Sequence, residues 1–252
     1  MTLAEAIAVF AAGVAAGSIN AVVGSGSLIT FPTLLAFGVP PVLANVTNNV
    51  GLVPGAVSSA YGYRRELAGQ RGRLLRLGIA SAIGAAAGAV LLLELPAATF
   101  QVIVVILILI ACALIIVQPW LNRWLAARRT GETPPHGGPI LFGGVCASGV
   151  YGGYFGAAQG VLMIGLLGTF LDEPLQRVNG LKNGLTGVVN GVAAVVFIAV
   201  SHVNWLLAAL IAVGSTIGGL LGARYGRRLP PIALRVLVVL VGLVAVAKLL
   251  FF

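Results

Sequence analysis

The most constraining feature of the sequence is an internal repeat, in which equivalent residues of the two halves lie 134 positions apart. A fixed internal period indicates that each half forms the same structural unit. The matched pairs need no gap and are Gly26 and Gly160, Pro40 and Pro174, Asn45 and Asn179, Asn49 and Asn183, Ser81 and Ser215, Gly84 and Gly218, Gly88 and Gly222, and Pro96 and Pro230.

The composition fixes the class of protein that the repeat builds. The chain is 59% hydrophobic and 8% charged, whereas a soluble domain carries about 25% charged residues. Apolar stretches of about 20 residues recur, which is the length of a membrane-spanning helix. The 35 glycines fit close packing of such helices. The sequence therefore predicts an all-α polytopic membrane protein.

Each half is predicted to contain one long apolar stretch followed by three ordinary spans. A polar segment with three arginines and the sequence TGETPP separates the halves and indicates a linker. We therefore expect a first repeat over 1–120, a linker over 121–138 and a second repeat over 139–252. The expected apolar stretches are 4–38, 42–63, 74–94 and 97–119, then 139–171, 176–200, 204–223 and 232–252.

The positions of the arginines predict how the halves are oriented. Basic residues gather in the 64–76 connection, in the linker and in the 224–228 turn, and short basic loops are typical of the cytoplasmic side. The 201–204 turn has no Lys or Arg, although it matches the basic connection of the first half. The two repeats are thus predicted to be inverted, in a bacterial plasma membrane, with both termini extracytoplasmic.

The net charge of +9 is explained by these loops, so we expect contact with anionic membrane lipids and no nucleic-acid partner.

The 4–38 and 139–171 stretches are predicted to be helical hairpins. As one helix, 139–171 would be about 50 Å long, which exceeds a hydrocarbon core of about 30 Å. The helix breaks are expected at 20–27 and 154–160, and the two tips would meet near the midplane.

The tips have the chemistry of an anion site. A helix that starts after Gly26 directs unpaired N–H groups and its positive dipole end toward the tip. Ser25 and Ser27 add hydroxyl groups, and Gln159 and Gly160 occupy the matching place in the second half. The alternative is that the glycines only permit tight turns and close packing.

Polar residues also follow each hairpin. Asn45 and Asn49 are spaced to share one helix face, and Asn179 and Asn183 repeat the pair. Lys182 replaces the equivalent Asn48, and a charge inside a span indicates function. It could instead extend to the interface, since it lies about two turns from a helix end. We expect these five residues to complete the substrate site.

The acidic residues all lie in or near loops or span ends, which disfavours cation transport. We expect no metal site and no cofactor. No nucleophile–base pair is evident, so we do not expect an enzyme.

The GxxxG pairs Gly84/Gly88 and Gly218/Gly222 are predicted to pack helices within the protomer, and homodimer formation stays open.

Three stretches carry a resemblance to a known family. The glycine-containing break is followed by Leu28-Ile-Thr-Phe-Pro32-Thr-Leu-Leu, then by Gly38-Val-Pro-Pro41 and Ala44-Asn-Val-Thr-Asn-Asn. This pattern resembles the sulfite exporter TauE/SafE family, also called the TSUP transporters, over nearly the whole chain. The family's usual run of glycines is here Gly24-Ser25-Gly26-Ser27 and Ala157-Ala158-Gln159-Gly160.

The resemblance implies export of small sulfur-containing anions, such as sulfite, sulfoacetate and related organosulfonates. Our leading hypothesis is a secondary transporter of such anions that works by alternating access around a midplane site. The alternatives are a passive anion channel and a permease for another small organic anion.

Overall fold

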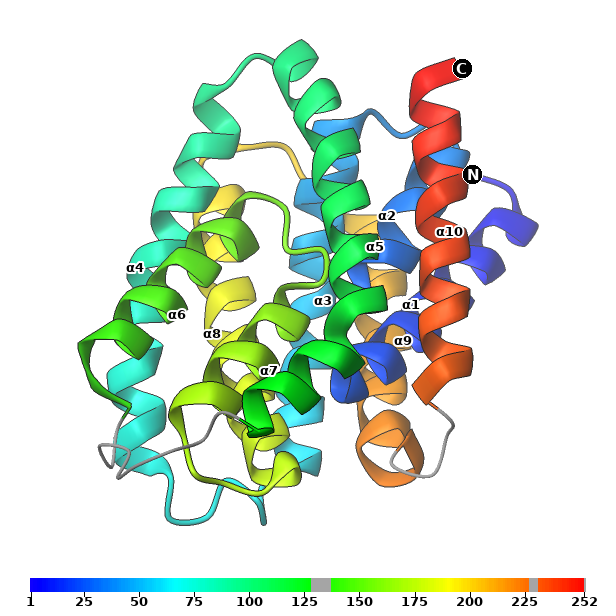
Figure 1. Cartoon of the computed structure of the whole chain (residues 1–252). Helices are drawn as coiled ribbons and strands as arrows, with labels where there is room; N and C mark the ends of the chain where they lie inside the picture. Colours follow the sequence, from blue (N-terminus) through cyan, green and yellow to red (C-terminus); the bar gives the residue numbers. More distant parts are fainter. Residues whose placement is uncertain (128–136, 227–230, 252) are drawn as a thin grey trace.

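The computed structural model describes residues 1–127, 137–226 and 231–251, and its regular structure in these ranges is entirely α-helical. The ten helices in chain order are α1 (Leu3–Val22), α2 (Ser27–Ala36), α3 (Pro41–Gly62), α4 (Arg71–Glu94), α5 (Ala97–Ala127), α6 (Gly138–Tyr154), α7 (Gln159–Phe170), α8 (Leu175–Val200), α9 (Trp205–Tyr225) and α10 (Pro231–Phe251) (Figure 1).

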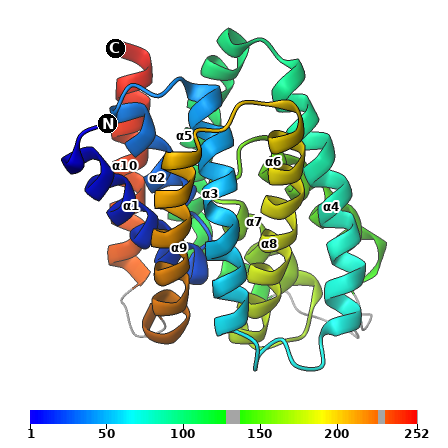
Figure 2. The ribbon, with the colours of Figure 1, turned by 180° about the vertical axis from the view of Figure 1, so that it is seen from behind.

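Helix starts recur with the period of the sequence. α3 and α8 begin at Pro41 and Leu175, and α4 and α9 begin at Arg71 and Trp205. Figure 1 and its reverse view, Figure 2, show that the two members of each pair run in opposite directions. α5 and α10 are likewise antiparallel.

Both long apolar stretches are interrupted by four residues. α1 and α2 are separated by 23–26, and α6 and α7 by 155–158. The interruptions lie within the segments at which the sequence predicts the hairpin tips. The return arms are short, since α2 has 10 residues and α7 has 12. At 1.5 Å per residue these arms are about 15 and 18 Å long, close to half of a hydrocarbon core.

Glycines allow close contact between the hairpins and the helices beside them. A Cβ atom at Gly218 in α9 would lie 2.0 Å from the carbonyl oxygen of Val14 in α1. A Cβ atom at Gly84 in α4 would lie 2.1 Å from the carbonyl oxygen of Cys146 in α6. The prediction that the GxxxG pairs pack helices within the protomer is therefore confirmed.

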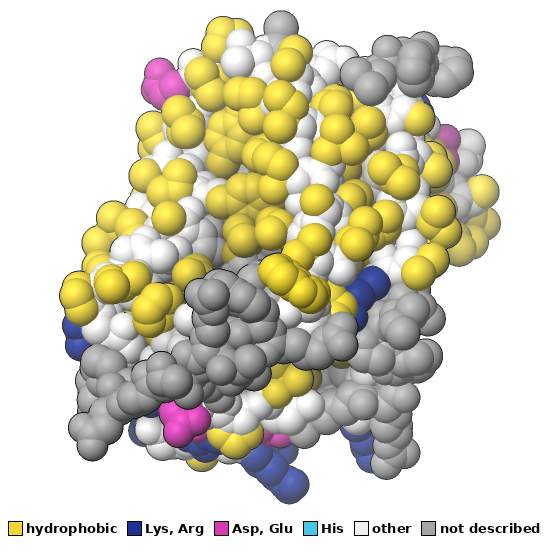
Figure 3. Space-filling view, in the orientation of Figure 1, with side chains coloured by type: hydrophobic (Ala, Val, Ile, Leu, Met, Phe, Trp, Pro, Cys, Tyr) yellow, Lys and Arg dark blue, Asp and Glu magenta, His cyan; other side chains and the backbone are white. Residues whose placement is uncertain are grey.

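Five helical segments are long and apolar enough to cross a membrane, which confirms a polytopic membrane protein. They are Leu3–Val22, Arg71–Glu94, Thr99–Trp120, Leu175–Val200 and Trp205–Tyr225. α3 is not among them, because three asparagines in its first half lower its mean hydropathy. Hydrophobic side chains dominate the middle of the face in Figure 3, while most of its charged side chains lie toward the lower end.

The lower end in Figure 1 holds the α3–α4 connection and the α7–α8 turn. The α2–α3, α4–α5 and α8–α9 connections lie at the upper end, together with the start of α1 and the end of α10. The described connections that are predicted to share one side of the membrane thus lie at one end of the molecule, while residues 128–136 of the linker and 227–230 of the α9–α10 connection lie outside the described residues. Which end faces the cytoplasm stays a prediction.

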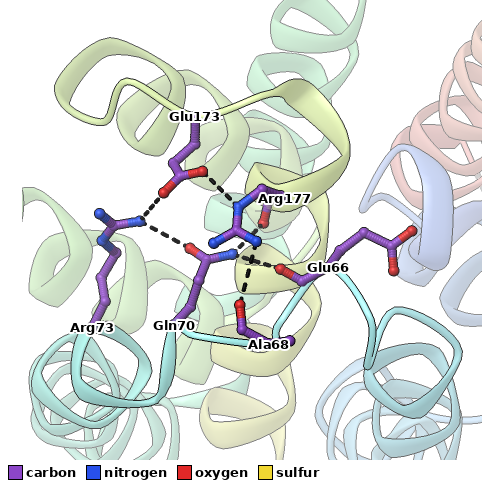
Figure 4. Close-up of polar contacts among 6 residues, drawn as sticks. All are labelled: Glu66, Ala68, Gln70, Arg73, Glu173 and Arg177. Atoms are coloured by element: carbon purple, nitrogen blue, oxygen red, sulfur yellow. Dashed lines mark hydrogen bonds and ion pairs between the residues drawn. The ribbon is translucent and has the colours of Figure 1, made fainter.

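An ion-pair network ties the two lower connections together (Figure 4). Glu173 accepts hydrogen bonds from Arg73 at 2.9 Å and from Arg177 at 2.6 Å. Gln70 donates to the Arg177 carbonyl oxygen at 3.2 Å, and Arg177 donates to that of Ala68 at 3.3 Å. Burial alone would raise the pKa of Glu173, but the hydrogen bonds and charges of the two arginines outweigh it and lower that pKa.

Candidate substrate site at the crossing of the hairpins

The two helix interruptions touch each other. The N–H of Gly160 donates to the carbonyl oxygen of Gly24 at 3.0 Å. A Cβ atom built on either glycine would lie 2.4 Å from the Cα atom of the other, a separation that real Cβ atoms do not show. Only two glycines permit this contact, so the sequence dictates how closely the hairpins approach.

The first interruption is closed by a side chain of its own hairpin. Gly26 donates its N–H to the Oδ1 atom of Asn20 at 2.6 Å. A Cβ atom at Gly26 would lie 2.2 Å from the carbonyl oxygen of Ala16. The adjacent Ser25 is 1% exposed, and its hydroxyl has no hydrogen-bond partner among the described residues. Ser27, the first residue of α2, is partly exposed.

The second interruption contains a strained backbone position. Ala158 has a φ of +57°, which is in the left-handed region that disfavours residues with a Cβ atom. The repeat-equivalent residue is Gly24, with a φ of +86°. Tyr151 donates its hydroxyl to the Ala157 carbonyl oxygen, and Phe155 packs edge-on against Phe31 of α2 with ring centroids 5.2 Å apart. Contacts with α6, through Tyr151, and with α2, through Phe31, therefore hold the turn in place.

Gln159 begins α7 beside the crossing. Its side-chain amide lies over α6, since a Cβ atom at Gly152 would be 2.4 Å from the Cδ atom of Gln159. The side chain is 1% exposed, and no described residue accepts a hydrogen bond from its Nε2 atom. A buried amide donor without an acceptor costs about 1–3 kcal/mol, so its position favours a bound polar molecule.

Lys182 is fully buried and caps the end of the first hairpin arm. Its Nζ atom donates to the carbonyl oxygens of Asn20 at 2.7 Å and Ala21 at 3.3 Å. Asn183 donates to the Ala21 oxygen at 3.1 Å. A cation at a helix C-terminus is stabilised by the helix dipole. Within the described residues, no carboxylate forms an ion pair with Lys182, so its counter-charge comes from carbonyl dipoles.

The other hairpin is capped differently. Asn45 of α3 donates to the carbonyl oxygen of Tyr154, the last residue of α6, at 2.9 Å. Tyr154 is the repeat equivalent of Asn20, so α3 and α8 each cap the hairpin of the opposite repeat. Asn48, the equivalent of Lys182, instead accepts a hydrogen bond from the hydroxyl of Thr30. The two caps therefore share a scaffold and differ in charge.

Asn49 and Asn179 are the two remaining predicted residues. They are 7% and 6% exposed, and the Oδ1 atom of each has no donor in the part of the chain that the structure describes. The Oδ1 atom of Asn45 is also without a donor there. Buried polar atoms in native proteins are paired with protein groups or with water. The three Oδ1 atoms can only accept hydrogen bonds, whereas the Ser25 hydroxyl and the Gln159 Nε2 atom are donors that can serve an anionic solute.

Asn20 also belongs to the candidate site, although it is not among the residues predicted from the sequence. Its side chain satisfies Gly26, and its carbonyl oxygen receives Lys182, so it connects the first interruption to α8. The position of Asn20 could have indicated this role, because it is an amide residue near the end of an apolar helix and lies six residues before Gly26.

Comparison with known proteins places the chain among membrane transporters. The family model described as sulfite exporter TauE/SafE matches residues 9–249. A probable membrane transporter protein of Haemophilus influenzae is 26% identical over 244 residues, which cover 96% of this chain and 93% of that protein.

Two further relatives also match nearly the whole chain. The probable membrane transporter protein YfcA of Escherichia coli strain K12 is 27% identical over 94% of this chain and 86% of its own length. The probable membrane transporter protein ORF9 of a Sinorhizobium species is 26% identical over 96% of this chain and 90% of its own. No solved structure is matched. The chain belongs to the sulfite exporter TauE/SafE family of membrane transporters.

Proposed function

We propose that the protein is a secondary transporter, with export as its direction, for small sulfur-containing anions such as sulfite and sulfoacetate-like organosulfonates. The observation that carries the proposal is the crossing itself. Ser25 directly follows Gly24, and Gln159 directly precedes Gly160. The Ser25 hydroxyl and the Gln159 Nε2 atom are both buried and have no hydrogen-bond partner among the described residues. A sulfonate or sulfite oxygen accepts hydrogen bonds from such donors.

The substrate site uses groups of both repeats. Gly26 and Gly160 supply N–H groups, Ser25, Ser27 and Gln159 supply side-chain donors, and Lys182 supplies positive charge. The asparagines complete the site with their amide groups, from Asn45 and Asn49 on α3 and from Asn179 and Asn183 on α8. An anion placed at two helix N-termini also gains from both helix dipoles.

The way these donors are engaged supports the proposal of alternating access. The N–H groups of Gly26 and Gly160 donate to Asn20 and Gly24, so an anion obtains them only when those bonds open. Lys182 likewise donates to the carbonyl oxygens of Asn20 and Ala21. Binding therefore exchanges bonds within the hairpins for bonds to the anion, which couples occupancy to separation of the two interruptions.

In the membrane, the end that carries the α3–α4 connection faces the cytoplasm, because its arginines match the distribution of basic residues in short cytoplasmic loops. The two repeats then have inverted topology in a bacterial inner membrane, with both termini outside. Cysteine accessibility at the exposed Arg71 and Glu94, tested in intact cells with a membrane-impermeant reagent, checks this orientation. Labelling only at Glu94→Cys supports it, and labelling only at Arg71→Cys contradicts it.

The experiment that tests the transport function is anion flux into proteoliposomes. We expect sulfite or sulfoacetate flux to saturate with concentration and to exceed that of acetate and other carboxylates of similar size. Flux that rises linearly without saturation would instead support a passive anion channel. Equal rates for all small anions would contradict a sulfur-anion substrate.

A further inference from the structure

A second polar site lies at the lower end of the molecule, away from the hairpin crossing. A pocket of about 630 Å³ is formed where α3 and α9 end side by side (Figure 2). Its charged lining comes from Arg64, Arg65 and Glu66 in the α3–α4 connection and from Arg224 in the last turn of α9. Tyr61 and Leu220 form much of the remaining wall.

The pocket carries an excess of positive charge. Three guanidinium groups face one carboxylate, and among the described residues none of the three arginines forms an ion pair with a carboxylate. The Arg64 guanidinium lies 4.5 Å from the centre of the Tyr61 ring and donates to the Tyr61 carbonyl oxygen at 3.2 Å. The Arg224 guanidinium lies 5.3 Å from the centre of the Tyr225 ring. Stacking orients these groups without neutralising them.

The wall of the pocket continues into an exposed apolar surface. Tyr61 is 61% exposed and Leu220 is 43% exposed, and Val57 one turn before Tyr61 is 60% exposed. These residues lie on the outer sides of helices α3 and α9, next to the helix ends. Tyrosine at such a position is typical of the membrane–water boundary. An occupant of the pocket therefore meets positive charge and hydrocarbon together.

We propose that this pocket binds the phosphate of an anionic phospholipid headgroup, with the acyl chains lying along Val57, Tyr61 and Leu220. Arginine suits this role because its planar guanidinium donates two parallel hydrogen bonds to phosphate oxygens. A soluble anion would use the guanidinium groups and leave the adjoining apolar surface unused, which is why the structure favours a lipid. The site is separate from the proposed transport site.

The test uses the purified full chain in a neutral detergent. Dioctanoyl phosphatidylglycerol is added, and binding is measured as the rise in melting temperature with lipid concentration. Each arginine near an anionic lipid contributes about a fivefold gain in affinity. The double substitution Arg64→Gln with Arg224→Gln is therefore expected to weaken apparent binding roughly 25-fold.

The matched control removes the same charge elsewhere at this end. Arg71 and Arg76 are exposed residues of α4 and do not line the pocket, so Arg71→Gln with Arg76→Gln is expected to bind phosphatidylglycerol like the wild type. Dioctanoyl phosphatidylcholine, which has no net charge, is expected to bind weakly to all three proteins. Equal loss of phosphatidylglycerol binding in both double variants would overturn the proposal, since general surface charge would then explain it.

Two further measurements address two separate questions. The first distinguishes a lipid from a soluble phosphate compound, and the second distinguishes loss of binding from a folding defect. Glycerol 3-phosphate shares the headgroup chemistry but has no acyl chain, and stabilisation by it that equals that of the lipid would overturn the lipid assignment. Arg64→Lys with Arg224→Lys keeps the charge, and partial recovery of lipid binding is expected. An unchanged melting temperature of both pocket variants without lipid would show that their weaker lipid binding is not a folding defect.

Discussion

The backbone N–H of Gly160 donates to the carbonyl oxygen of Gly24 at 3.0 Å, which joins the interruption of one hairpin to that of the other. The two residues come from opposite halves of the chain, and neither position has room for a Cβ atom. This contact brings the donors and acceptors of both repeats to one place, so variants at the crossing test the proposed substrate site.

Gly160→Ala is expected to force the two interruptions apart. The new Cβ atom would lie 2.4 Å from the Cα atom of Gly24, and overpacking of this kind costs about 1–3 kcal/mol. We expect a lower melting temperature and loss of sulfite or sulfoacetate flux in proteoliposomes. Gly168→Ala in the same helix is the control, because a Cβ atom there meets nothing within 4 Å; similar flux in both variants would argue against the role of the crossing.

Ala158→Gly is expected to stabilise the protein. The left-handed conformation of Ala158 costs about 1–2 kcal/mol, a cost that glycine does not have. Part of this gain is offset by the greater freedom of glycine in the unfolded chain. We expect the melting temperature to rise by about 2–4 °C. Ala157→Gly, at a buried neighbour whose φ is not positive, should lower it, and a fall in both variants would contradict the strain.

Lys182→Met tests whether the buried charge serves the anion. The substitution removes a buried charge and leaves the Asn20 carbonyl oxygen without its 2.7 Å hydrogen bond. Unpairing that oxygen costs about 1–3 kcal/mol, while loss of the desolvated charge offsets part of the cost. We expect a change of a few degrees in melting temperature but at least about a tenfold loss of anion affinity, equivalent to 1.4 kcal/mol.

The control for Lys182 is Arg76→Met, which removes one positive charge from an exposed position on α4. Anion binding by this variant is expected to match the wild type when measured by the anion-dependent shift in melting temperature. If both variants bind the anion equally weakly, Lys182 acts as a helix cap and has no specific role in substrate binding.

Stability is expected to fall in acid through Glu173. Its pKa is lower in the folded state because Arg73 and Arg177 outweigh the effect of burial. Its contribution is therefore complete above the unfolded-state pKa of about 4.3 and is lost as the pH falls through the folded-state pKa. Glu173→Gln should lower the melting temperature at pH 7 and reduce the difference between pH 7 and pH 3. If Glu173→Gln keeps the pH dependence of the wild type, the ion-pair network is not the source of the acid sensitivity. The same conclusion follows if Glu94→Gln reduces the pH dependence equally.

Much of the architecture follows from the sequence for simple reasons. Glycine and polar residues interrupt apolar runs at 20–27 and 154–160, and the helices end there because neither segment favours continued helix. The glycine pairs of α4 and α9 predict close helix packing, since only glycine removes the side chain from a contact with a neighbouring backbone.

The partners of the polar residues could not be predicted in this way. The sequence places Lys182 and Asn183 on one helix. Their hydrogen bonds to the Asn20 and Ala21 carbonyl oxygens depend on how the two halves pack, which local sequence does not encode. The outward faces of the helices raise the same difficulty. Apolar residues cover both lipid-facing and buried surfaces, and hydropathy does not distinguish Ile83, which is 56% exposed, from the buried Leu77.

A substrate site at the hairpin crossing is tested by comparing anion binding by the wild type and by a variant with Ser25→Ala and Gln159→Met. These substitutions remove the two buried donors that flank the Gly24–Gly160 contact, and they nearly preserve side-chain volume. Sulfite and sulfoacetate should each raise the melting temperature of the wild type and leave that of the variant unchanged, while the two proteins melt within a few degrees of each other without anion. An equal anion-dependent shift in both proteins would contradict a substrate site at the crossing of the hairpins.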